Sequence, residues 1–152
     1  MGINYVKGDA TDIPEDGKSR ILAHICNNKG GFGAGFSGAL SRRWKKVETS
    51  YREFHKKGLC VLGNIQIVHV RENLFVANMI AQDGYSKPGK PAIRYDALCK
   101  CLRELRVFCS PGEEVVMPRI GVGLSGGRWE EIEPLIQEEL AGKGITVTVY
   151  DL

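Results

Sequence analysis

The sequence predicts a single α/β domain with a mixed sheet. Strand-like and helix-like segments alternate along the chain, which is the pattern of a layered α/β domain. Two consecutive strand-like segments joined by a short turn predict a hairpin, and a hairpin makes the sheet mixed. The 152 residues suffice for one full hydrophobic core, so we expect one domain over residues 1–152.

Two strands are expected before the first helix. Ile3–Lys7 alternates in hydropathy and stops at Gly8, so it is interpreted as a strand. A turn rich in Asp, Pro and Gly follows. Arg20–Cys26 is then almost continuously apolar, which is typical of a strand buried on both faces of a sheet.

One long helix and the hairpin come next. Apolar residues recur at spacings of three and four between Phe36 and Phe54, with Ser37 as a possible N-cap and Gly58 as the stop. Asn64–Val70 and Leu74–Ile80 are expected to form the hairpin.

The next part of the chain predicts an irregular loop, a helix and a short strand. Ala81–Pro91 is rich in glycine and proline, so it is interpreted as a surface loop. Ile93–Phe108 has helical spacing, and Glu114–Met117 has the character of a short central strand.

A proline decides how the last helix is interpreted. Pro134 would remove a helical hydrogen bond, so we expect a turn over Arg128–Ile132 and a helix that starts near Glu133 and ends at Gly142. Ile145–Tyr150 is expected to be the last strand.

Composition indicates an ordinary soluble protein. The chain is 43% hydrophobic and 26% charged, with a net charge of +3. Such a mild excess argues against nucleic acid as a partner, and the basic runs Arg42–Lys46 and His55–Lys57 are interpreted as solvated helix faces. The five cysteines lack metal-site spacing and are expected to be free thiols in a reducing cytosol. No signal peptide or membrane span is expected, so the predicted location is cytoplasmic.

Two glycine-rich loops carry the strongest functional signal. The first is Asn27–Phe36 and the second is Ile120–Gly127, and each directly follows a strand-like segment. Glycine lets backbone N–H groups approach anionic oxygens without a Cβ in the way. Two such loops at equivalent strand ends predict a pair of jaws around a diphosphate. A Cβ at Gly33 or Gly121 is expected to block the phosphate path.

Three polar residues stand at the same strand ends and have two interpretations each. Asp9 either accepts a hydrogen bond from an exocyclic amine such as adenine N6 or caps the turn at Ala10–Ile13. His24 is either a core histidine or a functional group, and Asn27 is either a turn residue or a holder of a ribose hydroxyl. Neither loop ends in the Gly-Lys-Ser/Thr of a P-loop, and no metal-ligand cluster or G-x-S-x-G motif is present.

Four stretches of the sequence resemble the macro domain family. They are Tyr5–Asp9, Leu22–His24 with Gly33–Gly35, Met117–Leu124 and Thr146–Leu152. The resemblance spans the whole chain and is strongest to the branch that contains the terminal ADP-ribose protein glycohydrolase and the yeast ADP-ribose-1″-phosphate phosphatase. It implies a three-layer α/β/α fold with ADP-ribose in a cleft across the strand ends.

The resemblance also implies which residues bind the ligand. Asp9 would bind adenine, one loop would wrap the distal ribose and diphosphate, and the other would form the opposing phosphate loop. The implied ligand-binding residues are Asp9, Ala10, Asn27, Gly33, Ala34, Gly35, Phe36, Pro118, Ile120, Gly121, Val122, Gly123, Leu124, Ser125, Tyr150 and Leu152.

The catalytic residues of that branch are not carried over. The glycohydrolase uses a lysine just after the strand that matches Leu74–Ile80, where this chain has Gln82 and Asp83, and an aspartate where it has Ser125. A covalent lysine mechanism is therefore not expected. Hydrolysis by a positioned water remains, with His24, Asp83 and Asn27 as the expected assisting residues.

The expected function is binding of ADP-ribose with hydrolysis of ADP-ribosyl ester linkages, on acidic side chains or in O-acetyl-ADP-ribose. The alternatives are a non-catalytic reader of ADP-ribosylated protein and an ADP-ribose-1″-phosphate phosphatase. The expected partners are ADP-ribose or ADP-ribosylated protein, without cofactor, metal, membrane or nucleic acid. The chain is expected to be a monomer.

Overall fold

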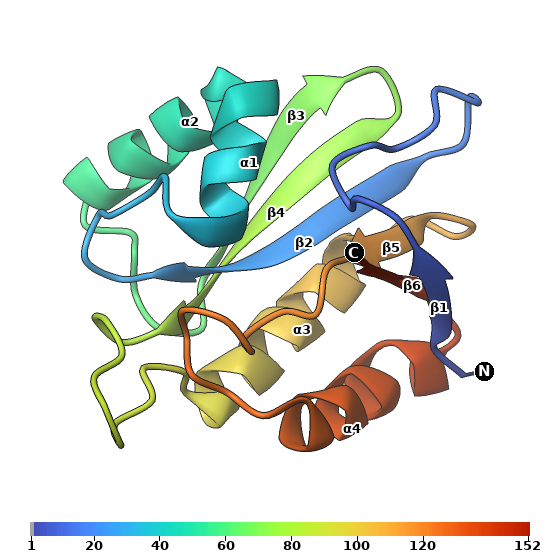
Figure 1. The fold of residues 1–152 in the computed structure, drawn as a ribbon. Coiled ribbons are helices and arrows are strands. Elements are labelled where there is room, and N and C mark those ends of the chain that lie inside the picture. Colours follow the sequence, from blue (N-terminus) through green and yellow to red (C-terminus); the bar gives the residue numbers. More distant parts are fainter. Residues whose placement is uncertain (1) are drawn as a thin grey trace.

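A computed structural model describes residues 2–152 and shows a six-stranded mixed sheet in the order β1-β6-β5-β2-β4-β3 (Figure 1). Five strands are parallel, and β3 pairs antiparallel with β4 at one edge. The strands are β1 Asn4–Lys7, β2 Arg20–Asn27, β3 Ile65–Arg71, β4 Leu74–Gln82, β5 Glu114–Met117 and β6 Thr146–Asp151. The predicted hairpin is confirmed.

Helices cover both faces of the sheet. The helices α1 Gly35–Arg43 and α2 Lys45–Lys56 lie on one face, and α3 Tyr95–Phe108 and α4 Trp129–Glu139 lie on the other (Figure 1). A short 3₁₀ turn, Ala141–Lys143, follows α4. This arrangement confirms the three-layer α/β/α fold.

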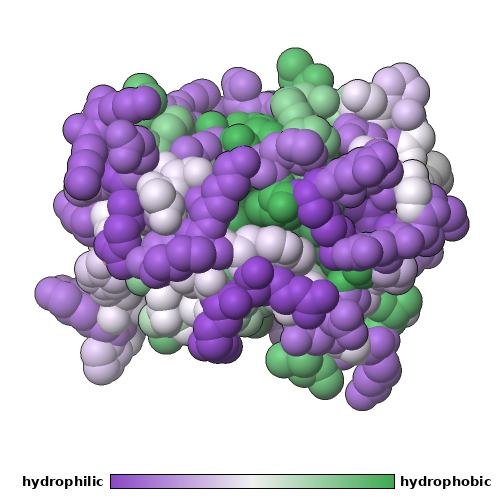
Figure 2. All heavy atoms as spheres, turned by 90° about the horizontal axis from the view of Figure 1, so that it is seen from above, coloured by the Kyte–Doolittle hydropathy of each residue, from purple (hydrophilic) through white to green (hydrophobic). Residues whose placement is uncertain are grey.

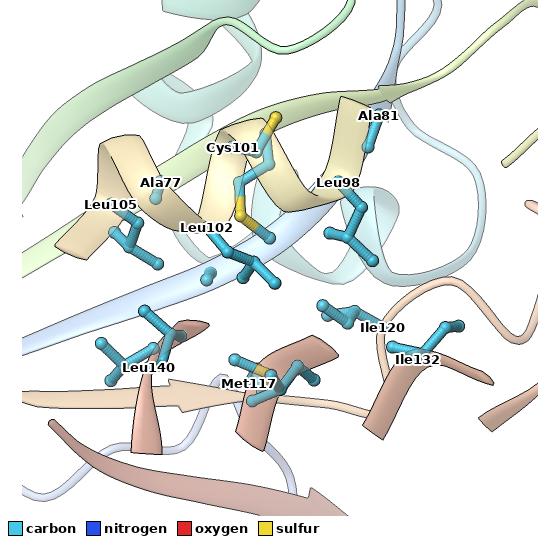
Figure 3. Close-up of a cluster of buried hydrophobic side chains, with 14 of the residues drawn as sticks. Ala77, Ala81, Leu98, Cys101, Leu102, Leu105, Met117, Ile120, Ile132 and Leu140 are labelled. Carbon is cyan, nitrogen blue, oxygen red and sulfur yellow. The ribbon is translucent and has the colours of Figure 1, made fainter. Parts of the chain in front are cut away.

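The larger part of the core lies between the sheet and the helices α3 and α4. Leu98, Leu102 and Leu105 of α3 point toward Met117 and Ile132 (Figure 3), and all five side chains are fully buried. Burying one such side chain contributes about 1.5–3 kcal/mol, so this layer fixes the strands on which the loops are mounted.

The strand β2 is buried on both faces, as its apolar run predicts. Ile21 and Ala23 pack on the α3 side, whereas Leu22 packs on the α1 side. Because side chains alternate along a strand, His24 and Cys26 share the α1 side with Leu22. His24 accordingly packs against aromatic residues at the start of α1.

The prediction of one helix from Phe36 to Phe54 is wrong, because the chain breaks at Trp44. Trp44 has φ −138° and ψ 90°, which ends α1 and begins α2. The apolar spacing continues through the break because Leu40, Trp44 and Val47 all pack in one cluster. Neither glycine nor proline marks the site, so no local residue pattern predicts the break.

The predicted N-cap is also displaced. Ala34 occupies the N-cap position of α1, and Ser37 lies in the first turn. The Ser37 hydroxyl donates to the carbonyl of Ala34 at 2.7 Å and accepts from the N–H of Gly33 at 3.0 Å. Ser37 therefore stabilises the entry to the helix without capping it.

The predicted start and end of the last helix are wrong. The helix α4 begins at Trp129, includes Pro134 and ends at Glu139, before the 3₁₀ turn. Pro134 removes only the hydrogen bond to the carbonyl of Glu130, an exposed residue in the first turn. Burial of Ile132 and Ile136 against the sheet outweighs that loss.

The outer face above α1 and α2 is mainly hydrophilic. Seen from above, hydrophilic residues surround a central band of hydrophobic ones (Figure 2). The basic residues Arg42, Arg43, Lys45 and Lys46 are exposed, as expected of a solvated helix face.

Candidate functional site

A cavity of about 730 Å³ lies at the carboxyl ends of β2, β4 and β5, between the two glycine-rich loops. Parallel strands bring the loops that follow them to the same edge of a sheet. The cavity is lined by His24, Ile25, Cys26, Asn27, Gly31, Phe32, Ala34, Gly35, Phe36, Ser37, Gln82, Tyr85, Ser86, Pro118, Arg119, Ile120, Gly121, Val122, Gly123, Leu124 and Ser125.

The Asn27 side chain organises the first loop. Its Oδ1 accepts the N–H groups of Lys29 at 2.8 Å and Gly31 at 3.2 Å, and its Nδ2 donates to the Gly31 carbonyl at 2.8 Å. This is the geometry of a turn residue. Although Asn27 lines the cavity, only the second N–H of its Nδ2 is left for a ligand.

The helix α2 holds the same loop from behind. The buried Tyr51 hydroxyl donates to the Asn27 carbonyl at 2.6 Å and accepts the N–H of Gly30 at 3.1 Å. Arg52 donates to the carbonyls of Gly30 at 2.9 Å and Phe32 at 3.0 Å. The loop is thus fixed through its backbone before any ligand binds.

Glycine at position 121 in the second loop is required by packing. Gly121 has φ +79°, and a Cβ there would lie 2.7 Å from Ile93 Cδ1 and 2.9 Å from Ile132 Cδ1. The expected reason for glycine at this position, a clear phosphate path, is therefore wrong, because the Cβ would enter the core. At Gly33 a Cβ would meet nothing within 4 Å, and the positive φ of +121° is what favours glycine.

Both loops present backbone N–H groups that are not used within the protein. Among residues 2–152, the N–H groups of residues 121–125 donate no hydrogen bond. The same holds, within that range, for Ala34, Gly35 and Phe36 at the start of α1, where a helix leaves its first N–H groups free. Because these residues line opposite sides of one cavity, the site suits a ligand with several anionic oxygens.

Gln82 and Ser125 form a neutral pair that links β4 to the second loop. The Gln82 Nε2 donates to the Gly84 carbonyl at 2.9 Å, which leaves Oε1 as the acceptor. The Ser125 hydroxyl donates to that Oε1 at 2.6 Å. Both side chains are buried, so this wall of the cavity carries no charge.

His24 is neutral and has a defined tautomer. The tautomer follows from a series of hydrogen bonds between side-chain amides. The series begins at the Ser50 carbonyl, which accepts a hydrogen bond from Gln66 Nε2 at 2.9 Å. Gln66 Oε1 accepts from Asn78 Nδ2 at 3.0 Å, so Asn78 Oδ1 is the acceptor for His24 Nε2–H at 2.5 Å. Burial lowers the pKa of His24 from 6.5 to about 4. The Nδ1 atom therefore keeps a lone pair at neutral pH.

Aromatic rings surround His24. Phe32 meets its imidazole edge-on with ring centroids 5.8 Å apart, and Phe36 lies at 5.9 Å. Cys26 shares the face, with its Sγ 3.5 Å from His24 Nε2. Burial raises the pKa of the Cys26 thiol well above its ordinary value, so this sulfur is a thiol and not a nucleophilic thiolate.

Asp83 lies outside the cavity lining. Its carboxylate accepts from Asn28 Nδ2 at 3.1 Å and lies 3.8 Å from an Arg94 guanidinium nitrogen. The expectation that Asp83 assists chemistry in the cavity has no support in this geometry. Its position after β4 predicts a role in the cavity, but the side chain contacts Asn28 and Arg94, which are also outside the lining.

Two exposed side chains cross over the first loop instead. The Tyr85 hydroxyl lies 2.1 Å from where a Cβ on Gly31 would be, and Leu124 Cδ1 lies 3.1 Å from where one on Gly35 would be. Tyr85 was missed because its loop was interpreted only as an irregular surface segment. Glycine at both positions lets these side chains narrow the opening.

Five of the implied ligand-binding residues do not line the cavity: Asp9, Ala10, Gly33, Tyr150 and Leu152. Asp9 Oδ1 accepts the N–H and the hydroxyl of Thr11, both at 2.8 Å, and these bonds lower the pKa of its carboxyl. The turn-capping interpretation is therefore confirmed. Within residues 2–152, Asp9 Oδ2 accepts no hydrogen bond and is open to solvent.

Within residues 2–152, Arg119 is the one charged side chain in the lining. It forms two hydrogen bonds to Asp151, at 2.6 Å and 3.1 Å, and its guanidinium lies 5.2 Å from the ring centres of both Tyr5 and Trp129. Its charge is thus already balanced. Arg119 lies between Pro118 and Ile120, two of the implied ligand-binding residues, but no spacing pattern predicts its place in the lining.

No group of three or more His, Cys, Asp or Glu side chains within residues 2–152 is arranged to hold a metal ion. In the same range, every helix is too short or too polar to cross a membrane.

Solved structures place the chain in a family. A macrodomain protein from Streptomyces coelicolor is 41% identical, superposes with a TM-score of 0.85 and is covered over 99% of both chains. A protein of unknown function from Bacteroides thetaiotaomicron is 48% identical, with a TM-score of 0.92 over 100% of this chain and 99% of the other. No family model matches the sequence. The chain belongs to the macro domain family.

Curated relatives are more distant but nearly as long. The ADP-ribose 1″-phosphate phosphatase of Lodderomyces elongisporus is 28% identical over 99% of this chain and 100% of its own length. The human ADP-ribose glycohydrolase is 29% identical over 99% of this chain and 91% of its own.

Proposed function

We propose that this macro domain binds the ADP-ribosyl group and hydrolyses its ester linkage to an acidic side chain or an acyl group. The observation that carries the proposal is the pair of unused N–H runs, residues 34–36 and 121–125, on opposite sides of one cavity. A diphosphate presents anionic oxygens on both sides and matches this arrangement. The names of the curated relatives support the same ligand.

The ligand is oriented by what each end of the cavity offers. The diphosphate lies between the N–H runs, and the distal ribose lies toward Asn27, Gln82 and Ser125. The adenine lies at the open end beside Asp9, whose free Oδ2 accepts from the exocyclic amine. Micromolar affinity is expected, which corresponds to about −8 kcal/mol.

The chemistry that fits this site is hydrolysis without a strong acid. A carboxylate is a good leaving group because its pKa is about 4, so the ester bond at C1″ breaks without protonation by the protein. A water must still be oriented toward C1″. His24 Nδ1, held unprotonated by the bond from Nε2–H to Asn78, accepts a hydrogen bond from that water.

A second candidate is a reader that binds ADP-ribosylated protein without turnover. It is favoured by the uncharged Gln82–Ser125 pair and by the position of Asp83 outside the lining. Both leave the cavity without a carboxylate.

One assay separates the two candidates. Release of ADP-ribose from glutamate-linked ADP-ribosylated protein is measured for the wild type, His24→Gln and the matched control His69→Gln, an exposed histidine on β3. Release by the wild type and the control, with at least a tenfold loss in His24→Gln, is expected. Binding of ADP-ribose without release would establish the reader. Equal release by the wild type and both variants would show that His24 takes no part in the reaction.

Asp83→Ala tests the placement of that carboxylate. Full activity is expected, because Asp83 does not line the cavity. If Asp83→Ala releases less ADP-ribose while its stability against unfolding is unchanged, Asp83 takes part in the reaction after all.

A further inference from the structure

The loop between β4 and α3 carries two lysines on a small hairpin beside the cavity. Tyr85 and Ser86 line the cavity, and the chain then turns back on itself. The N–H of Lys87 donates to the carbonyl of Lys90 at 3.1 Å, and the reverse bond is 2.8 Å. Ser86 Oγ accepts the N–H of Ala92 at 2.9 Å. These bonds hold the backbone of Lys87 and Lys90 in a hairpin that directly follows two residues of the cavity lining.

A third lysine lies near the start of the same loop. Lys29 belongs to the first glycine-rich loop, and its Cε lies 3.9 Å from where a Cβ on Gly84 would be. Lys29, Lys87 and Lys90 are all exposed, and the one lysine that forms an ion pair within residues 2–152 is Lys45. We call these three residues the lysine rim.

Within residues 2–152, the acidic residue at the start of this loop pairs with an arginine and not with the lysine rim. Asp83 lies 3.8 Å from Arg94 and accepts a hydrogen bond from Asn28. At the β1 and β6 end the charges are paired within the protein, because Asp12 lies 3.7 Å from an Arg43 guanidinium nitrogen and Arg119 is paired with Asp151. Within residues 2–152, the lysine rim is thus a group of exposed lysines that form no ion pair and lie on segments next to the cavity lining.

We propose that the lysine rim docks an acidic segment of the protein that carries the ADP-ribosyl group. The proposal rests on the proposed function, which directs the distal ribose, and hence the attached chain, toward this side of the cavity. Exposed cations attract a segment rich in aspartate and glutamate and repel a basic one. The net charge of +3 is too small for a nucleic-acid stripe, so a protein segment is favoured over RNA.

The test uses fluorescent 12-residue peptides with one ADP-ribosyl group on a central residue through a non-hydrolysable linkage. The flanking residues are acidic, neutral or basic. Affinities are measured by anisotropy for the wild type, K87E/K90E and K29E. The matched control K18E/K143E makes the same charge change at two exposed lysines outside the cavity lining. Free ADP-ribose is titrated into each protein.

The wild type is expected to bind the acidic peptide about tenfold more tightly than the neutral one, as a few exposed ion pairs allow. This preference is expected to vanish in K87E/K90E, to weaken in K29E and to persist in K18E/K143E. It is also expected to shrink between 50 and 300 mM salt, values chosen to shorten the screening length to roughly half. Affinity for free ADP-ribose is expected to change less than twofold.

Failures of the two proposals are distinguishable. If the wild type does not bind free ADP-ribose, the proposed function is wrong. If it binds ADP-ribose but treats the three peptides alike, the lysine rim does not dock an acidic segment. The proposal is also overturned if a fluorescent single-stranded RNA binds the wild type and loses affinity in K87E/K90E while the peptides are not discriminated.

Discussion

The lowered pKa of His24 makes the stability of the protein depend on pH in the acid range. Its pKa is about 4 in the fold and 6.5 as an ordinary value, because burial disfavours the charged ring. Between these pH values the unfolded chain binds a proton that the folded chain does not. Stability contributed by the neutral ring is therefore present above pH 6.5 and is lost as pH falls toward 4.

Between pH 7 and pH 4, the free energy of unfolding of the wild type is expected to fall by about 3 kcal/mol more than that of His24→Gln. The figure follows because each pKa unit corresponds to about 1.36 kcal/mol. Urea unfolding at several pH values measures it. Parallel curves for the two proteins over this range would show that His24 is not buried as described.

Of two glycines in the second loop, Gly121 is required by packing and Gly123 is not. Gly121→Ala places a Cβ 2.7 Å from Ile93 Cδ1 at a φ of +79°, so it is expected to destabilise the fold by about 1–3 kcal/mol. Gly123→Ala is the matched control, because a Cβ there meets nothing within 4 Å and the backbone is unstrained. Denaturant unfolding of both variants is the measurement. Equal stability would contradict the packing role of Gly121.

At the scale of elements, α2 acts as the support of the first loop. Tyr51→Phe keeps the ring but removes the hydroxyl that bonds the Asn27 carbonyl and the Gly30 N–H. The unpaired buried groups cost about 1–3 kcal/mol, and faster amide exchange at Gly30 is expected. Tyr95→Phe is the control, since its hydroxyl accepts the N–H of Arg128 at 3.3 Å and lies outside the cavity lining. Unchanged exchange at Gly30 would show that α2 does not hold the loop.

The elements also show what the sequence could predict. The β2 run, the hairpin and α3 were predicted because burial and spacing are local patterns. The break at Trp44 and the inclusion of Pro134 in α4 were not, since tertiary packing overrides local propensity at both places. Strand alternation identified His24 and Cys26 as neighbours. The Gln82–Ser125 contact and the reach of Tyr85 join distant segments, and no local pattern encodes them.

At the scale of the whole molecule, the sheet brings loops from three strands to one edge and leaves their N–H groups free around one cavity. The layers behind it are well packed, so the arrangement exists before a ligand arrives. The central claim is that this cavity binds ADP-ribose through both loops.

Isothermal titration of ADP-ribose and AMP into the wild type, Gly123→Leu and Gly2→Leu tests that claim most directly. Gly123 lines the cavity and has open space at its Cβ position, so a leucine there is expected to obstruct the ligand, whereas Gly2 is equally open and lies outside the lining. Micromolar binding of ADP-ribose to the wild type and to Gly2→Leu, at least tenfold weaker binding of AMP, and at least a tenfold loss in Gly123→Leu are expected. AMP binding as tightly as ADP-ribose, or full affinity in Gly123→Leu, would contradict the account.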